Sequence, residues 1–108
     1  MKKVTLTCAH AIVKYLIAQK ILIDGKKEPL FPGVFGIFGH GNVACLGQAL
    51  EENQKDLPTY RGHHEQNMAL TGIGYARGKR RQQIFVATSS VGPGATNMVT
   101  AAAVAMSN

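Results

Sequence analysis

Tryptophan is absent from this 108-residue chain, and aromatic residues make up only 6% of it. Long apolar runs are absent as well, since no stretch reaches the roughly 20 residues that a membrane-spanning helix needs. The basic start is followed by His10 and Lys14 without a small-residue cleavage site, which argues against a signal peptide. With 45% hydrophobic and 17% charged residues, the composition is that of one small globular domain. We therefore expect no membrane partner.

Only two cysteines are present, and their spacing matches neither a metal site nor a disulfide framework. Cys8 and Cys45 both lie in apolar, helix-like stretches. Free cysteines in such surroundings are usually buried, and free thiols are typical of cytoplasmic proteins. The sequence therefore predicts two buried free thiols and a cytoplasmic location.

Acidic residues are scarce, because six of them stand against twelve basic ones and leave a formal charge of +6. The densest basic run is Arg-Gly-Lys-Arg-Arg at 77–81. Such a run could bind a phosphate backbone, but it equally suits the solvated end of a helix, where cations complement the helix dipole. No aromatic residues interleave with it, so we favour the helix end and expect no nucleic-acid partner.

Apolar spacing predicts helices and short strands in alternation. Thr7 is a plausible N-cap for a first helix ending near Lys20, and Asp24-Gly25 marks a turn in an irregular or hairpin connection. Further helices are expected at 43–50, 63–78 and 95–106, and strands at 34–38, 57–61 and 84–87. This alternation predicts an α/β fold of three layers, α/β/α, with a parallel sheet covered on both faces.

Two features of the predicted helices concern packing. Gly72 and Gly74 each cost on the order of 1 kcal/mol relative to alanine inside a helix, which indicates a close neighbour. The last helix is apolar nearly all round and needs cover on every side, while three strands are few for this architecture. We therefore expect residues 1–108 to form a truncated domain.

Three segments rich in glycine, histidine and asparagine follow the predicted strands, at 39–42, 62–67 and 90–97. In a parallel sheet, ligands gather beyond the carboxyl ends of the strands, so these segments are expected to lie near one another. In the last of them, two glycines flank a proline just before a helix. Such a loop can bring backbone N–H groups close to a ligand.

Two familiar motifs are only partly present. Gly39-x-Gly41-x-x-Ala44 fits the loose dinucleotide fingerprint, but Arg61 stands where that fold has an acidic residue after the next strand. His64-Glu65 is part of the zinc-peptidase motif, but the second histidine would fall at position 68, which is Met68. The sequence therefore permits a nicotinamide site without favouring it, and we expect no metal site in this chain.

Taken in order, three strings resemble the N-terminal pyrimidine-binding domain of thiamine-diphosphate enzymes of the acetohydroxyacid synthase group. They are His64-Glu65-Gln66-Asn67-Met68-Ala69, Gly74-Tyr75-Ala76-Arg77 and Gly92-Pro93-Gly94-Ala95-Thr96-Asn97. Each string is common by itself, whereas the series with its spacing is specific. The resemblance implies an α/β fold and thiamine diphosphate as cofactor.

Within this group, the similarity is strongest to members that hydrolyse a carbon–carbon bond of a cyclic 1,2-dione, and it runs from about Thr5 to the last residue. It rests on the strings at 38–43, 46–52 and 88–94. Acetolactate-forming members are the alternative. They more often have a Pro-Gly-Gly loop where this chain has Gly39-His40-Gly41-Asn42.

The resemblance implies that Glu65 activates the cofactor. Thiamine diphosphate becomes a carbanion once its own aminopyrimidine removes a proton, and a carboxylic acid that shares a proton with the opposite ring nitrogen favours the required tautomer. Such a carboxyl group should be held away from water, which raises its proton affinity. A glutamate near a helix start otherwise favours the charged form, so burial has to outweigh that effect.

The resemblance gives other residues looser roles. His40, on the loop after the first strand, could move protons during ring opening or simply bond to the backbone. At most one of His63 and His64 should face the same pocket as Glu65, since adjacent helical residues point about 100° apart. The candidates for cofactor contacts are Gly92, Pro93 and Gly94, and those for substrate contacts are Gly41, Asn42, His64 and Asn97.

The resemblance also implies parts that this sequence does not contain. Relatives bind the diphosphate through Mg²⁺ in a second domain that starts with Gly-Asp-Gly, whereas neither Asp24 nor Asp56 has glycine on both sides. Relatives build each active site between two subunits. We therefore expect only the pyrimidine end of the cofactor to meet this chain, self-association as a dimer, and no turnover by the chain alone. A non-catalytic split subunit that pairs with a separate diphosphate-binding chain is the other possibility.

Overall fold

The computed structural model describes residues 3–107, except for the side chain of His40. The helical segments are α1 (Cys8–Ala18), α2 (Gly39–Asn42), the π-helical turn η1 (Val43–Gly47), α3 (Gln48–Glu52), α4 (Glu65–Gly78), α5 (Pro93–Thr96) and α6 (Val99–Ser107). The strands are β1 (Lys20–Ile23), β2 (Lys26–Pro29), β3 (Val34–Gly36), β4 (Thr59–Arg61) and β5 (Val86–Thr88). Strands β4, β3 and β5 form a parallel sheet in that order, and β1 and β2 form a separate antiparallel hairpin.

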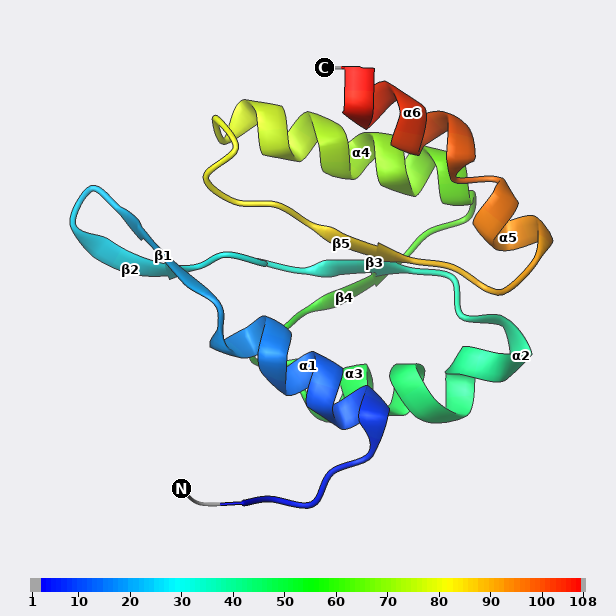
Figure 1. Ribbon diagram of the computed structural model, residues 1–108, viewed down its shortest axis with the longest axis horizontal. Helices are drawn as coiled ribbons and strands as arrows, with labels where there is room; N and C mark the ends of the chain where they lie inside the picture. Colours follow the sequence, from blue (N-terminus) through cyan, green and yellow to red (C-terminus); the bar gives the residue numbers. More distant parts are fainter. Residues whose placement is uncertain (1–2, 108) are drawn as a thin grey trace.

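Helices cover both faces of the parallel sheet. Figure 1 shows α1 and α3 on one side of it and α4 and α6 on the other. The chain passes through α2, η1 and α3 between β3 and β4, and through α4 between β4 and β5, so β3 occupies the middle of the sheet. This arrangement confirms the predicted three-layer α/β fold.

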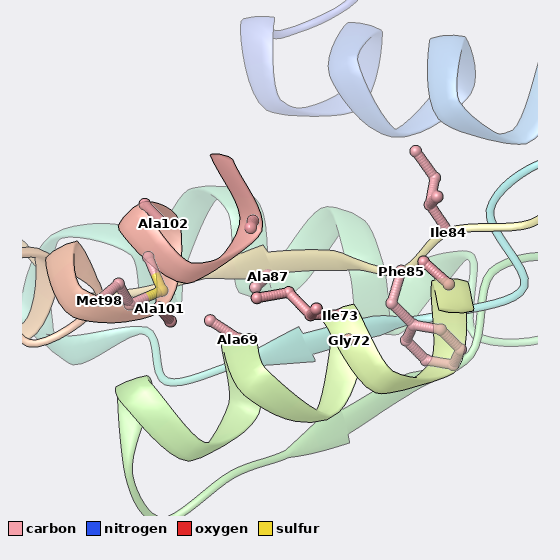
Figure 2. Close-up of a pocket in the computed structure, with 11 residues that line it drawn as sticks. Ala69, Gly72, Ile73, Ile84, Phe85, Ala87, Met98, Ala101 and Ala102 are labelled. Carbon is pink, nitrogen blue, oxygen red and sulfur yellow. The ribbon is translucent and has the colours of Figure 1, made fainter. Parts of the chain in front are cut away.

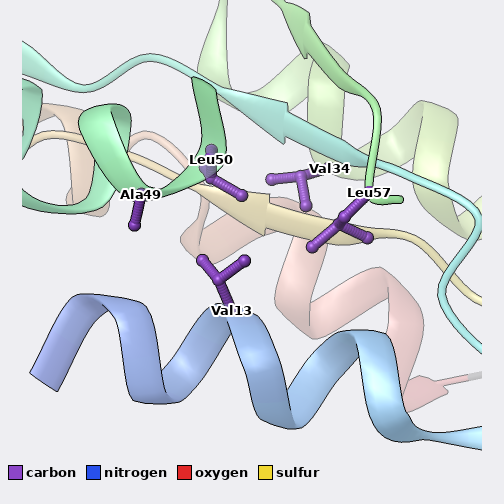
Figure 3. Packing of buried hydrophobic residues seen from close by; sticks show 5 residues of the cluster. All are labelled: Val13, Val34, Ala49, Leu50 and Leu57. Carbon is purple, nitrogen blue, oxygen red and sulfur yellow. The ribbon is translucent and has the colours of Figure 1, made fainter. Parts of the chain in front are cut away.

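The most tightly packed layer lies between the sheet and the pair α1 and α3 (Figure 3). Five side chains that are at most 2% exposed form its core: Val13, Val34, Ala49, Leu50 and Leu57. The helix α1 begins as predicted, because Thr7 Oγ1 accepts a hydrogen bond of 3.1 Å from the backbone N–H of His10. Full burial of one valine or leucine side chain contributes about 1.5–3 kcal/mol, so this layer is a main source of stability.

Aromatic rings lie on the other face of the sheet. Phe85 stacks on Phe35 with ring centroids 4.7 Å apart, and Tyr75 of α4 meets Phe85 edge-on at 4.7 Å. Gly33 makes this possible, because a Cβ atom there would lie 2.7 Å from the Phe85 ring. Alternation along β3 thus sends Val34 to one face of the sheet and Phe35 to the opposite one.

Beside these rings the packing opens into an apolar hollow of about 340 Å³ (Figure 2). Its walls come from α4, from β5 with the residues before it, and from α6 with the residue before it: Ala69, Gly72, Ile73, Ala76, Ile84, Phe85, Ala87, Met98, Ala101, Ala102 and Ala105. The short alanine side chains on both helices leave this space. The apolar residues that α4 turns to this side, Ala69, Ile73 and Ala76, are therefore only partly covered.

The turn predictions and the basic run agree with the structure. The hairpin β1–β2 turns at Asp24 and Gly25, whose φ angles of 52° and 83° suit the tight turn of a two-residue hairpin. The basic run is exposed at the end of α4, which ends at Gly78. Arg80 and Arg81 both have positive φ angles there, of 54° and 62°.

Two packing predictions are wrong in part. Cys8 and Cys45 are free as predicted, but both are exposed rather than buried. The physical reason is that α1 buries Val13, on another side of the helix, while η1 buries none of its residues. A Cβ atom added to Gly72 would lie 3.7 Å from Phe85 Cβ, so this glycine has the expected neighbour, whereas Gly74 faces open space.

The segments after β3 and β5 differ from the predicted loop and helix. Residues 39–42 form the short helix α2 instead of a loop, and this helix continues through η1 into α3. The single helix expected at 95–106 is divided into α5 and α6. Helix α5 begins earlier, at Pro93, because proline's fixed φ angle and missing N–H suit a first helical position. In α6, Val99 and Met106 remain 62% and 89% exposed, so the described residues do not supply the cover expected for it.

Candidate functional site

The three glycine- and histidine-rich segments meet at one edge of the sheet, as predicted. Gly36 at the end of β3 pairs in parallel register with Arg61 of β4 and with Thr88 of β5. The chain therefore leaves all three strands in the same direction at the same edge. The segments that follow supply α2, the start of α4 and the start of α5.

The start of α4 places Glu65 at this edge. His64 has an extended backbone and caps the helix, since its Nδ1 accepts a hydrogen bond of 3.3 Å from the backbone N–H of Asn67. Glu65 is the first residue of the helix and lies in its first turn. The sequence thus fixes both side chains through the helix start: the histidine ring turns back over the first turn, and the carboxyl group projects beside it.

Helix α5 brings Asn97 to the same place. Gly92 takes a positive φ angle of 67°, which glycine adopts without steric cost, and Pro93 then starts the helix. Asn97 caps the end of α5, and its Nδ2 donates a hydrogen bond of 3.0 Å to Glu65 Oε1. The same Nδ2 lies 3.4 Å from His64 Nε2. Residues 32 positions apart in sequence are thereby joined.

An open depression of about 980 Å³ adjoins this cluster. It is lined by Glu65, Ser90, Gly92, Pro93, Gly94, Thr96 and Asn97. Five of these residues were candidates from the sequence. Ser90 and Thr96 were not, and the structure adds them.

Ser90 is surrounded by glycines. A Cβ atom on Gly39 would lie 2.5 Å from Ser90 Cβ, and one on Gly94 would meet Ser90 Oγ. The Gly94 position also faces the carboxyl group, because its added Cβ would lie 3.1 Å from Glu65 Oε2. The only trace of this packing in the sequence is the presence of glycine at both positions, and that signal does not identify the serine as their partner.

The charge state of Glu65 differs from the one that a buried carboxylic acid would have. The pKa of Glu65 lies below its ordinary value of 4.5, first because Asn97 donates a hydrogen bond to the carboxylate and second because a backbone N–H of the helix start does the same. The side chain is partly exposed, so burial opposes these bonds only weakly. The proton affinity expected from the resemblance therefore requires cover that the described residues do not provide.

The residues of α2 lie beside the depression and do not line it. Asn42 Nδ2 donates a hydrogen bond of 3.1 Å to the backbone carbonyl of Ser89 and so ties α2 to the loop after β5. Gly41 is exposed and has open space around it. His40 belongs to α2, but its side chain lies outside the described part of the chain. A separate cavity of about 300 Å³ is lined by Ile37, Phe38, Gly39, Val43, Arg61 and Gly62.

The described side chains form no metal centre. Among them, no group of three or more histidine, cysteine, aspartate or glutamate residues could hold a metal ion. No helix within residues 3–107 has the length and apolar character needed to cross a membrane.

Comparison with known proteins gives a consistent result. Residues 7–108 match the family described as "Thiamine pyrophosphate enzyme, N-terminal TPP binding domain". Over all 108 residues the chain is 54% identical to a 3D-(3,5/4)-trihydroxycyclohexane-1,2-dione hydrolase of Geobacillus thermodenitrificans, and 50% identical to proteins of the same name from Clostridium tetani and Bacillus thuringiensis. The chain spans 17% of the length of each of these curated relatives. No solved structure matches it at a significant level.

Proposed function

Because the chain belongs to the thiamine pyrophosphate enzymes and represents their N-terminal TPP binding domain, we propose that it forms the pyrimidine-binding part of a hydrolase. The reaction of that hydrolase is the cleavage of a carbon–carbon bond in a cyclic 1,2-dione, trihydroxycyclohexane-1,2-dione, during inositol breakdown. Support for this substrate comes from the names of relatives that are 50–54% identical over the whole chain.

The observation that carries the proposal is the position of Glu65. Its carboxyl group lies at an open depression of about 980 Å³, between the helix start that fixes it and the backbone of Gly94. A flat heteroaromatic ring that needs a carboxyl group at one edge fits such a place, because the missing side chain at Gly94 leaves room beside Glu65 Oε2. Gly92 and Pro93 line the same depression and complete the contact surface for the ring.

The chain's own residues have defined roles in this proposal. When bound, thiamine diphosphate supplies the carbanion chemistry, for which Glu65 holds a proton at the ring nitrogen. Once covered, Glu65 would lose contact with water, and this burial would raise its pKa from the lowered value of the open site. We assign contacts with a small-molecule substrate to His40 and Asn42, because both belong to α2, whose backbone lies next to the depression.

The rest of the active site lies outside these residues. We assign the diphosphate and Mg²⁺ to a second domain, in the same polypeptide or in a separate chain, and the complete site to a dimer. The exposure of Val99 and Met106 on α6 favours an arrangement in which another domain or subunit covers this helix. The 108 residues alone are then half of a site, and a cytoplasmic location fits their free thiols.

A chimeric enzyme tests the proposal. The first 108 residues of the Geobacillus thermodenitrificans relative are replaced by this chain, and hydrolysis of the cyclic dione is measured with thiamine diphosphate and Mg²⁺. We expect the chimera to be active and Glu65→Gln to lower kcat by about 10²–10⁴-fold, the usual contribution of a positioned proton donor or acceptor. Glu51→Gln, an exposed carboxylate of α3, is the matched control and should keep full activity.

Two outcomes would contradict the proposal. One is a folded chimera whose activity is the same with Glu65→Gln as without it. The other is turnover by the 108-residue chain alone, since half of a site should not complete the reaction. Condensation of pyruvate to acetolactate in place of dione hydrolysis would keep the role of Glu65 and replace the substrate by that of the carboligase alternative.

A further inference from the structure

Asn97 is a polar residue at the start of an otherwise apolar stretch of the chain. It stands between α5 and α6, where its backbone N–H bonds to the carbonyl of Pro93 at 3.0 Å. Its neighbours from Met98 to Met106 are mostly alanine, valine and methionine. The partly buried amide is thus fixed by a helix end, and it points at the start of α4 rather than at solvent.

Two atoms of α4 face this amide at different distances. Glu65 Oε1 lies 3.0 Å from Asn97 Nδ2, and His64 Nε2 lies 3.4 Å from the same atom. An asparagine side chain has a donor end and an acceptor end, and turning it over exchanges them. Whether Glu65 and His64 need a donor or an acceptor therefore decides whether the amide nitrogen or the amide oxygen faces α4.

His64 has its tautomer fixed by the helix cap. Because Nδ1 accepts the hydrogen bond from the backbone N–H of Asn67, the proton of the neutral ring is on Nε2. Nε2 is then a donor, so its 3.4 Å contact with the amide nitrogen is not a hydrogen bond. His64 alone would favour the amide oxygen on this side.

Glu65 requires the amide nitrogen of Asn97 on this side. A carboxylate only accepts hydrogen bonds, and an amide oxygen facing it would put two oxygens in contact. Hydrogen bonds to an ionised group are roughly twice as strong as neutral ones, so the carboxylate outweighs the histidine. The charged Glu65 therefore holds the amide with its nitrogen toward Oε1. The segment 88–98 carries no charged residue, so His64 is the titratable group in contact with this pair.

We propose that Asn97 is a positioning residue that reserves Oε1 of Glu65 and thereby confines proton exchange to Oε2. The two oxygens are not equivalent in this arrangement. Oε1 accepts from the amide nitrogen, while Oε2 lies beside Gly94 at the depression. The carboxylate also accepts from the backbone N–H of Glu65 itself, which belongs to the same helix start and leaves the contrast with Asn97 in place. This role rests on the proposed function only in that the proton leaving Oε2 is the one shared with the pyrimidine ring.

Nuclear magnetic resonance on the 108-residue chain tests the contact without any catalytic assay. The carboxyl carbon of Glu65 and the side-chain amide of Asn97 are followed while the pH is lowered. We expect both to change with the same midpoint, and we expect Glu65→Gln to leave the Asn97 amide without that transition. Asn97→Ala, which removes the donor without adding a charge, should raise the Glu65 midpoint. Thr100→Ala on the exposed side of α6 is the control and should leave it in place.

The active chimera supplies the second measurement. Asn97→Ala should move the acid limb of the kcat/KM profile to higher pH and lower kcat while KM changes little. A merely structural role would change the amount of folded enzyme and leave the limb in place. The inference would be overturned if the Asn97 amide signal did not change as Glu65 titrates. If the two signals change together but the folded chimera is inactive, the proposed function alone would be overturned.

Discussion

The two faces of the parallel sheet are packed in different ways. On the face of α1 and α3, five core side chains that are at most 2% exposed form one cluster (Figure 3). On the face of α4 and α6, Met68 and Ala101 are the buried apolar side chains of the two helices, and a hollow of about 340 Å³ remains (Figure 2). We call the side of α1 and α3 the close face and the side of α4 and α6 the open face. The close face has its own buried core, whereas the open face leaves space that further atoms could fill.

The candidate site lies at the edge of the sheet, and α4 of the open face supplies part of it. Glu65 begins α4, and Asn97 lies two residues before the start of α6. A helix pair with a hollow between its members and exposed apolar residues on its outside leaves room for adjustment when a ligand or another domain arrives. The comparison therefore separates a face that holds the fold together from a face that positions the functional groups.

The largest expected effect on stability comes from removing a buried side chain from the core of the close face. Leu57→Ala removes a fully buried side chain from the cluster and should lower the free energy of unfolding by about 2–5 kcal/mol. Leu22→Ala, at a hairpin position that is 65% exposed, is the matched control and should stay within about 0.5 kcal/mol of the parent. Urea unfolding measures both. Equal losses for the two variants would mean that the cluster is not the core.

Enlarging one alanine on each face contrasts the two layers directly. Ala49→Leu inserts atoms into a full core and should cost about 1–3 kcal/mol. Ala102→Leu inserts the same atoms beside the hollow and should be neutral or stabilise by up to about 2 kcal/mol. Thermal unfolding of the pair checks the sign of each change. A loss at Ala102 as large as that at Ala49 would show that the hollow closes in solution.

How far the sequence alone reaches also differs between the faces. Periodic apolar residues and the cap at Thr7 are local signals. They predicted α1, the turn at Asp24-Gly25 and the alternation of helices with the three strands of the parallel sheet. Glu65 and the Gly92–Gly94 loop were found through motif order and spacing. The Asn97 to Glu65 hydrogen bond and the place of Ser90 could not be found in this way, because they depend on where α5 lies relative to α4.

The errors have the same origin. Cys8 and Cys45 were expected to be buried because their neighbours in sequence are apolar, yet the side of the helix that faces the sheet decides burial. The break between α5 and α6 was missed because every residue near it is compatible with helix. Both cases show that local composition does not determine which surface of an element meets the rest of the chain.

The helix cap on the close face gives an effect of intermediate size. Thr7→Ala removes the acceptor for the N–H of His10 and should lower the free energy of unfolding by about 1 kcal/mol. Thr7→Ser keeps the hydroxyl and should recover most of this loss. The difference between the two variants in urea unfolding isolates the cap. If serine is no better than alanine, the threonine methyl group rather than the hydroxyl is responsible.

The smallest effects come from one carboxylate on each face, and they appear only in acid. On the close face, His10 Nε2 lies 2.6 Å from Glu52 Oε2, and this hydrogen bond, followed by that from Gln48, lowers the pKa of Glu52 below 4.5. On the open face, Asn97 lowers the pKa of Glu65 in the same way. A depressed pKa in the folded state means that each group stabilises the fold above about pH 4.5 and loses this contribution as the pH falls through the lowered pKa.

Glu52→Gln and Glu65→Gln should therefore each flatten the decline of stability as the pH falls below about 4.5, measured by urea unfolding at a series of pH values. Glu51→Gln provides the control for removal of one negative charge from α3. Both carboxylates are solvated, so the changes should be small compared with those at Leu57 and Ala49. Covering the open face should change the titration of only one of these two carboxyl groups. In the chimera, the midpoint of the Glu65 titration should rise while that of Glu52 stays the same. The reason is that α3 lies on the opposite side of the sheet from α4 (Figure 1). A parallel rise at both positions would contradict the division of the molecule into a self-sufficient face and a face that depends on a partner.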